Sequence, residues 1–297
     1  MNKLIFFILL NFVCSLAQAQ SNSKILAKGA ELKPLSSDYK FTEGPAADKE
    51  GNVYFTDQPN NRIMKWSTDG HLSVYMEDAG RANGLFFDNK GNLIACADKN
   101  NELWLIDENK EVAVLVNDFE GKKLNGPNDV WVHPEGGIYF TDPFYKRDYW
   151  NRTEKEIESE NVYYLSPDRK ELTVAADGLV RPNGIVGTPD GKTLYVADIN
   201  DGKTYTYQIG DDGSLTNREL FVEMGSDGMT LDTKGNLYLT GKAGVTVFNS
   251  SGEQIEQIAV PEGWTANVCF GGKKSKTLFI TAMKSVYTID TKAKGVH

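Results

Sequence analysis

Six polar side chains recur along the chain, each at nearly the same distance before an apolar and aromatic stretch. The six are Glu43, Asn83, Asn128, Asn183, Asp227 and Asn267. Carboxylate and amide oxygens, without Cys or His, favour Ca²⁺ or Mg²⁺ over zinc or copper. An all-protein oxygen cage favours calcium, because magnesium tends to keep its water ligands. We therefore expect one divalent cation, Ca²⁺, with other divalent ions able to substitute for it.

Turn formation is the alternative explanation for these residues. Five of the six are followed by Gly or Asp, and Asn-Gly and Asp-Gly are strong turn signals, so a turn is the better explanation for any single copy. Turn chemistry does not call for Glu43, however. All six residues also precede the centre of the next strand-like stretch by 11 or 12 positions. This regular spacing favours a shared structural position, and a purely structural ring remains the other interpretation.

The strand-like stretches themselves form an internal repeat. Their central residues are Tyr54, Ile94, Tyr139, Tyr195, Tyr238 and Phe279, spaced by 40, 45, 56, 43 and 41 positions. These are blade lengths of a β-propeller, and no segment shows a sustained helical period. The sequence therefore predicts an all-β, six-bladed β-propeller. In this fold, equivalent residues of the innermost strands encircle the central channel, where the six polar side chains would converge.

The longest spacing comes from an insert, Pro143 to Glu160, which follows the stretch ending in Thr141-Asp142. It contains four aromatic residues next to a charged run. Long loops in compact domains are often functional, so the insert could cover the mouth of the channel. A solvated surface loop held by its aromatic side chains is an equally good interpretation.

The N-terminus has the features of a secretory signal peptide. Lys3 precedes an apolar run, Leu4–Val13, that is too short to cross a bilayer, and the small-residue pattern ends at Ala19. We expect cleavage after Ala19, a single propeller domain over residues 20–297, and a secreted or periplasmic location. Lipid attachment at Cys14 is less favoured, because the residues before it are not small.

The composition limits the range of partners and metals. The net charge of −9 disfavours binding to nucleic acid and to anionic membranes. Cys96 and Cys269 lie in apolar stretches and are expected to be buried free thiols, with a disulfide as the alternative. His71 and His133 lie next to turns, so the soft ligands are too few for a zinc site. No nucleophile elbow, phosphate-binding glycine loop or zinc-protease motif is present.

Several motifs resemble the family of gluconolactonases and regucalcin (senescence marker protein 30). The most specific are Arg81-Ala82-Asn83-Gly84-Leu85, Gly126-Pro127-Asn128-Asp129-Val130 and Arg181-Pro182-Asn183-Gly184-Ile185. The resemblance spans nearly the whole chain after the signal peptide. It implies a calcium-dependent six-bladed propeller that hydrolyses small lactones or esters.

The resemblance also implies roles for individual residues. The family's metal ligands correspond to Glu43, Asn128, Asn183 and Asp227, and Asp227 would also be the general base. The residues near the substrate would be Asn83, Asn128, Asp129 and Asn267. Gly126 stands where regucalcin-like members carry an arginine, which argues against a regucalcin-like sugar preference.

Three functions are consistent with these residues. The first is a calcium-dependent hydrolase of a sugar lactone or similar small ester. The second uses the same metal cage on phosphoesters or organophosphates. The third is a non-catalytic propeller that binds sugar and in which calcium only braces the axis, since propellers host both binding and catalysis.

Overall fold

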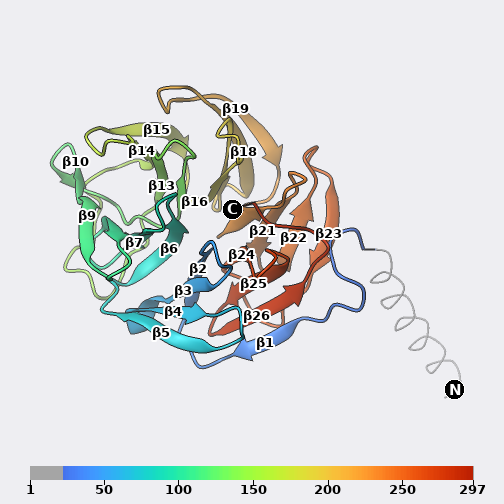
Figure 1. Cartoon of the computed structure of the whole chain (residues 1–297). Coiled ribbons are helices and arrows are strands. Elements are labelled where there is room, and N and C mark those ends of the chain that lie inside the picture. Colours follow the sequence, from blue (N-terminus) through green and yellow to red (C-terminus); the bar gives the residue numbers. More distant parts are fainter. Residues whose placement is uncertain (1–22, 297) are drawn as a thin grey trace, which may run out of the picture.

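The computed structural model describes residues 23–296, and the predicted signal peptide, residues 1–19, lies outside them. Six four-stranded antiparallel sheets surround a central axis, so the predicted six-bladed propeller is confirmed (Figure 1). A short hairpin, β10 (Asp118–Phe119) with β11 (Lys122–Lys123), and one 3-10 turn, Gln58–Asn60, accompany them. Within the described residues, no helix is long and apolar enough to cross a membrane.

Each sheet follows one order from the axis outwards. The innermost strands are β2 (Thr42–Ala47), β6 (Ala82–Phe87), β12 (Val130–Val132), β16 (Pro182–Gly187), β20 (Met229–Leu231) and β24 (Asn267–Gly271). The second strands are β3 (Val53–Asp57), β7 (Leu93–Ala97), β13 (Ile138–Asp142), β17 (Thr193–Asp198), β21 (Leu237–Gly241) and β25 (Thr277–Ala282). The third strands are β4 (Arg62–Trp66), β8 (Glu102–Ile106), β14 (Glu160–Leu165), β18 (Lys203–Ile209), β22 (Gly244–Phe248) and β26 (Ser285–Asp290). The outer strands are β5 (Leu72–Glu77), β9 (Val112–Val116), β15 (Leu172–Leu179), β19 (Leu215–Val222), β23 (Gln254–Ile258) and β1 (Lys33–Ser36).

The repeated apolar stretches form the second strands, which are buried because neighbouring blades cover both of their faces. Phe55 of the first blade and Phe279 of the last are both fully buried, with ring centroids 5.3 Å apart. Such contacts fill the spaces between blades, and these strands therefore read as nearly continuous apolar runs. Cys96 and Cys269 are both buried free thiols, as predicted. Burial raises the pKa of both thiols above the ordinary value.

An N-terminal strand closes the ring. Strand β1 pairs with β26 and forms the outer edge of the blade whose other strands come from the C-terminus. The two ends of the described chain therefore hold one sheet together, and no blade is left with an unfinished edge. The sequence repeat did not reveal this strand, because it has only four residues and does not follow the repeated pattern.

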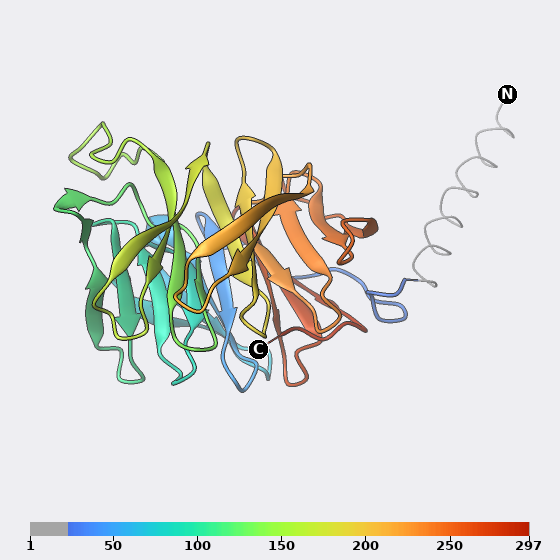
Figure 2. The ribbon, with the colours of Figure 1, turned by 90° about the horizontal axis from the view of Figure 1, so that it is seen from above.

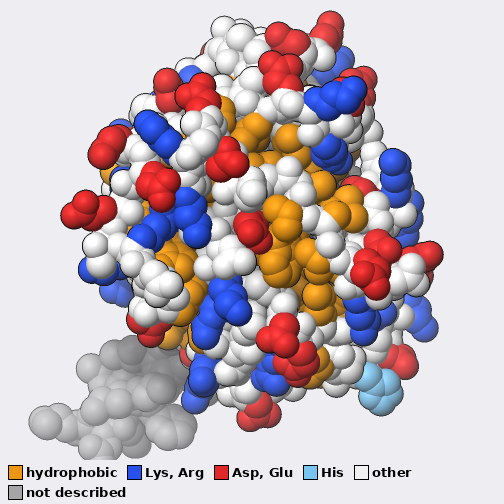
Figure 3. Space-filling view, turned by 90° about the vertical axis from the view of Figure 1, so that its left-hand side faces the viewer, with side chains coloured by type: hydrophobic (Ala, Val, Ile, Leu, Met, Phe, Trp, Pro, Cys, Tyr) orange, Lys and Arg blue, Asp and Glu red, His pale blue; other side chains and the backbone are white. Residues whose placement is uncertain are grey.

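The outer surface is mixed in character. On the flank formed by the blades at the left of Figure 1, apolar side chains gather between acidic and basic ones (Figure 3). Exposed valines of the outer strands include Val112 and Val114 of β9 and Val174 of β15. The polar ring residues are instead inside the propeller.

Candidate active site

The six polar residues occupy equivalent places at the beginning of the innermost strands. Glu43, Asn83, Asn183 and Asn267 lie within β2, β6, β16 and β24, while Asn128 and Asp227 stand two residues before β12 and β20. The common register predicted from the spacing is therefore present. The turn interpretation is wrong for Glu43, Asn83 and Asn183, because each lies with its following glycine inside a strand.

The glycines that follow the ring residues make room for the next blade. A Cβ atom on Gly44 would lie 2.1 Å from the backbone oxygen of Asn83. A Cβ atom on Gly228 would lie 1.9 Å from Cγ of Asn267. Any larger residue would collide with the neighbouring ring residue, so glycine allows the side chains to approach one another.

Threonines at the ends of the second strands hold the ring from behind. The Thr56 hydroxyl donates to the backbone oxygen of Asn83 at 3.1 Å, and that of Thr141 donates to the backbone oxygen of Asn183 at 2.8 Å. Each hydroxyl belongs to the blade preceding the ring residue that it binds. The repeated strand ending thus fixes the backbone of the ring.

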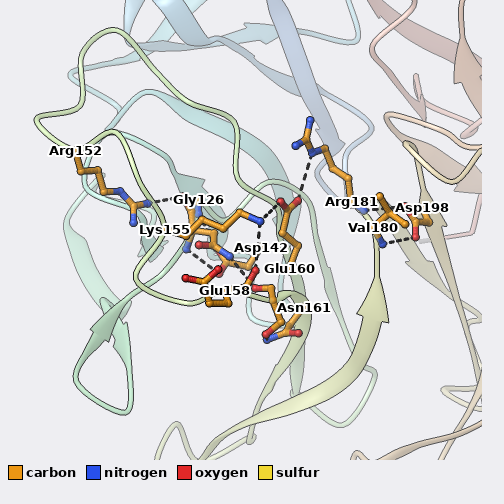
Figure 4. A network of polar contacts seen from close by, with 12 residues as sticks. Gly126, Asp142, Arg152, Lys155, Glu158, Glu160, Asn161, Val180, Arg181 and Asp198 are labelled. Carbon is orange, nitrogen blue, oxygen red and sulfur yellow. Dashed lines mark hydrogen bonds and ion pairs between the residues drawn. The ribbon is translucent and has the colours of Figure 1, made fainter.

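Aspartates follow these threonines or occupy the equivalent position in another blade. They hold the backbone segments that lead to the ring residues. Asp142 accepts hydrogen bonds from the amides of Asn125 at 2.8 Å and Gly126 at 2.6 Å. Asp198 accepts from the amides of Val180 and Arg181 at 2.7 and 2.8 Å (Figure 4). Burial raises the pKa of Asp142 to about 7. Its carboxylate accepts hydrogen bonds from both of these amides, which indicates a structural role.

Two ring carboxylates lie close enough to affect each other. Glu43 is 4% exposed and accepts a hydrogen bond from the Gly44 amide at 3.0 Å. Burial raises the pKa of Glu43 well above its ordinary value, and the nearby Asp227 carboxylate raises it further. Asp227 is partly exposed, but desolvation of its carboxylate by the surrounding protein raises its pKa to about 6. Hydrogen bonds from Trp264 and Asn183 oppose this rise.

The donor set fits a calcium ion. The Oδ1 atom of Asn183 is buried and has no hydrogen-bond partner, although its Nδ2 atom is bound. A cation would satisfy this oxygen and compensate the two adjoining carboxylates, Glu43 and Asp227. Across residues 23–296, no group of three or more His, Cys, Asp or Glu side chains could hold a metal ion. A cation here would therefore depend on amide oxygens as well as on the carboxylate pair.

Asp129 and Asn267 face along the channel. Both line a cavity of about 970 Å³ that continues between the innermost strands and is also lined by Val296 near the C-terminus. Asp129 accepts hydrogen bonds from the amides of Val130 at 3.0 Å and Ile185 at 3.4 Å. Burial raises its pKa to about 8. The side chains of Asn83 and Asn128 are buried and make no hydrogen bonds within the described part of the chain.

The insert rises from the face of the propeller opposite the C-terminus (Figure 2). It belongs to the third sheet and runs from residue 143 to 159, since Glu160 already begins β14. The Tyr145 hydroxyl accepts a hydrogen bond from Asn183 Nδ2 at 2.9 Å. This contact favours the interpretation in which the insert covers the channel mouth. It argues against a solvated surface loop.

Buried acids outside the ring anchor the insert. Asp98, at the end of the second blade's β7, accepts hydrogen bonds from Arg147 Nε at 2.8 Å and from the Tyr149 hydroxyl. Glu160 lies between Lys155 and Arg181, which it binds at 2.6 and 3.3 Å (Figure 4). The insert is therefore tied to two blades besides its own.

The absence of an arginine at position 126 has a structural reason. A Cβ atom on Gly126 would lie 2.9 Å from Oδ1 of Asp98 and 3.1 Å from the Trp150 ring. The insert occupies the space that a longer side chain would need.

Two side chains at the mouth were not identified as site residues from the sequence. Trp264 donates from Nε1 to Asp227 Oδ2 at 2.6 Å, although it lies in the loop before β24 and outside the repeat. Tyr145 was recognised only as one of four aromatics in the insert. Only the tertiary structure brings either residue to the ring.

Comparisons with known proteins agree with this arrangement. The model of the SMP-30/gluconolactonase/LRE-like region matches residues 41–284. The chain belongs to this family. The chain is 30% identical to a gluconolactonase from Zymomonas mobilis. The match covers 91% of this chain and 84% of that protein. The chain is 26% identical over 80% of its length to the lactonase drp35 of Staphylococcus aureus, covering 72% of that protein.

Solved structures show the same fold. A gluconolactonase from Xanthomonas campestris superposes with a TM-score of 0.83 and 29% identity, covering 90% of this family member and 91% of that chain. A calcium-binding regucalcin from Agrobacterium tumefaciens gives a TM-score of 0.76 at 18% identity, covering 90% and 95%. At that identity, the second likeness concerns the fold alone.

Proposed function

We propose that this protein is a calcium-dependent hydrolase that opens a sugar-type lactone, or a similar small ester, at the insert-covered end of the channel. The observation that carries the proposal is the proximity of Glu43, Asp227 and Asn183, whose carbonyl oxygen has no hydrogen-bond partner. The lactonase names of the relatives support the same reaction class. The hard oxygen donors support calcium as the cation.

Asp227 is the proposed general base. Its Oδ2 atom is held by the Trp264 indole at 2.6 Å, which fixes the carboxylate at the mouth. Asp227 accepts the proton of a water that attacks the lactone carbonyl. It then gives this proton to the leaving oxygen of the lactone as the C–O bond breaks. Bound calcium would act as a Lewis acid toward the carbonyl oxygen.

The buried amides have complementary roles in this proposal. Asn183 would hold calcium together with Glu43, Asp227 and Asn128. Asn83 and Asn128 have side chains without hydrogen-bond partners in residues 23–296, so their polar ends remain available to a substrate or to the cation. We also propose that the chain is exported after cleavage behind Ala19 and acts outside the cytoplasm, on the basis of the N-terminal sequence pattern.

The test is proton release from D-glucono-1,5-lactone and other aldonolactones by the protein beginning at residue 20. We expect activity with calcium, loss of activity with a chelator, and a fall in kcat of about 10²–10⁴-fold for Asp227→Asn. Asp201→Asn, a change at a surface aspartate, is the matched control and should retain wild-type activity.

Inactivity towards every lactone, with calcium still bound tightly, would overturn the lactonase proposal. Turnover of a phosphotriester under those conditions would identify the organophosphate alternative. Tight binding of sugar without turnover would identify a calcium-braced binding protein.

A further inference from the structure

The orientation of the Asn183 amide decides whether this residue can bind a cation. Asn183 is 1% exposed, and its carbonyl oxygen has no hydrogen-bond partner, whereas its amino group donates to the Tyr145 hydroxyl at 2.9 Å and also to the Asp227 carboxylate. An amide has one acceptor end and one donor end, and only the acceptor end can coordinate a metal. The partners of the donor end therefore determine which end is left for a cation, and Tyr145 is the partner that lies outside the ring.

Tyr145 is well placed to be that partner because its own ring is held on the insert. The guanidinium carbons of Arg147 and Arg181 lie 5.4 and 4.9 Å from the centroid of the Tyr145 ring. Each arginine is itself fixed by a buried acid: Arg147 by Asp98 at 2.8 Å, and Arg181 by Glu160 at 3.3 Å. The aromatic ring thus has two anchored cations beside it.

We propose that Tyr145 is a positioning residue that holds the donor end of Asn183, so that the unpartnered oxygen is left for the cation and the insert completes the divalent-cation site. The inference rests on the proposed function for the identity of the cation as calcium. It assigns the insert a specific task beyond covering the mouth. A hydrogen-bonding partner that orients a metal ligand in this way typically contributes 10- to 100-fold to metal affinity or activity.

The test is a calorimetric titration of the metal-free protein with Ca²⁺ alone, comparing wild type with Tyr145→Phe. The substitution removes the hydroxyl and keeps the ring between the arginines. We expect the Kd for calcium to rise about tenfold. At saturating calcium, kcat should recover to within about twofold of wild type, because excess cation turns the amide back by mass action.

Tyr205→Phe is the matched control. Tyr205 also has a guanidinium over its ring, that of Arg218 at 4.0 Å, and its hydroxyl donates to Asp201 at 2.9 Å, but it lies on β18. Its loss should leave the Kd for calcium unchanged. Thermal unfolding in chelator should be the same for all three proteins, which would show that neither substitution disturbs the fold.

The outcomes separate the two proposals. Calcium binding by the wild type with an unchanged Kd in Tyr145→Phe would overturn the positioning role and leave the proposed function intact. A kcat that stays low at saturating calcium would also overturn it, because the hydroxyl would then act on the reaction and not on the amide. A wild type that binds no calcium would overturn the proposed function together with this inference.

Discussion

The charge of Asp227 is set by opposing influences at one carboxylate. Burial raises its pKa to about 6, and hydrogen bonds from Trp264 and Asn183 lower it against that effect. A carboxylate with such a pKa is ionised at neutral pH. Its pKa is also close enough to neutral pH for it to accept a proton in the reaction. The indole of Trp264 therefore has an electrostatic consequence as well as a geometric one.

Replacing Trp264 with Phe should move the acidic limb of the pH profile of kcat/KM to higher pH. The indole N–H stabilises the ionised carboxylate, so its loss raises the pKa of Asp227, by about one unit for a hydrogen bond to a charged group. The profile is measured at saturating calcium with a gluconolactone substrate. Trp150→Phe removes an N–H that binds the backbone oxygen of Asp98 and should leave the limb in place. A limb that stays fixed in Trp264→Phe would argue against Asp227 as the base.

The insert is the element that departs most from the repeat, and its attachment depends on a few buried side chains. Asp98 is 3% exposed and receives hydrogen bonds from Arg147, Tyr149 and Gln58, the last at 3.3 Å. These partners come from the insert and from the first blade. One carboxylate of the second blade thus connects three parts of the mouth.

Replacing Asp98 with Ala should loosen the insert. The change leaves the partly buried Arg147 without its ion-pair partner, so we expect a loss of about 1–3 kcal/mol in the free energy of unfolding. Urea unfolding measures this loss, and limited trypsin digestion should cut faster in the insert. Asp201→Ala breaks a partly exposed pair with Lys203 and a hydrogen bond from the Tyr205 hydroxyl, and it should cost less than about 1 kcal/mol. Equal effects of the two substitutions would contradict the anchoring role.

At the scale of the whole molecule, the propeller buries acids in its interior. Burial raises the pKa of Asp129 to about 8, of Asp142 to about 7 and of Asp227 to about 6, against about 3.9 in an unfolded chain. At pH values between the pKa in the unfolded chain and these raised pKa values, the folded state therefore binds more protons than the unfolded state. The resulting stability is fully present below about pH 4 and is lost as the pH rises through about 6 to 8.

The midpoint of thermal unfolding in chelator should accordingly fall between about pH 5 and 8, and calcium should reduce the fall by compensating the ring carboxylates. Circular dichroism at a series of pH values measures both curves. Asp129→Asn removes the group that titrates at about pH 8 and should flatten the upper part of the chelator curve. A midpoint that rises over this range in chelator would show that the buried acids do not control stability.

The sequence by itself determined the fold and the ring. A blade-length repeat can be seen in one dimension because every second strand is buried on both faces and must be apolar, as Phe55 and Phe279 illustrate. The ring could be predicted because residues at one register of a closed repeat meet at the axis, which places Glu43 beside Asp227 although 184 residues separate them. The closing strand β1, only four residues long, gave no comparable pattern.

Only the tertiary structure decided which way the ring amides face and what surrounds them. Tyr145 and Trp264 reach Asn183 and Asp227 from loops outside the repeat, so no spacing places them. Asp98 looks like an ordinary strand-end residue, yet it anchors the insert across blades. Periodicity records burial along one strand, whereas these contacts depend on how loops from different blades fold over a common mouth, and a linear pattern contains no record of that approach.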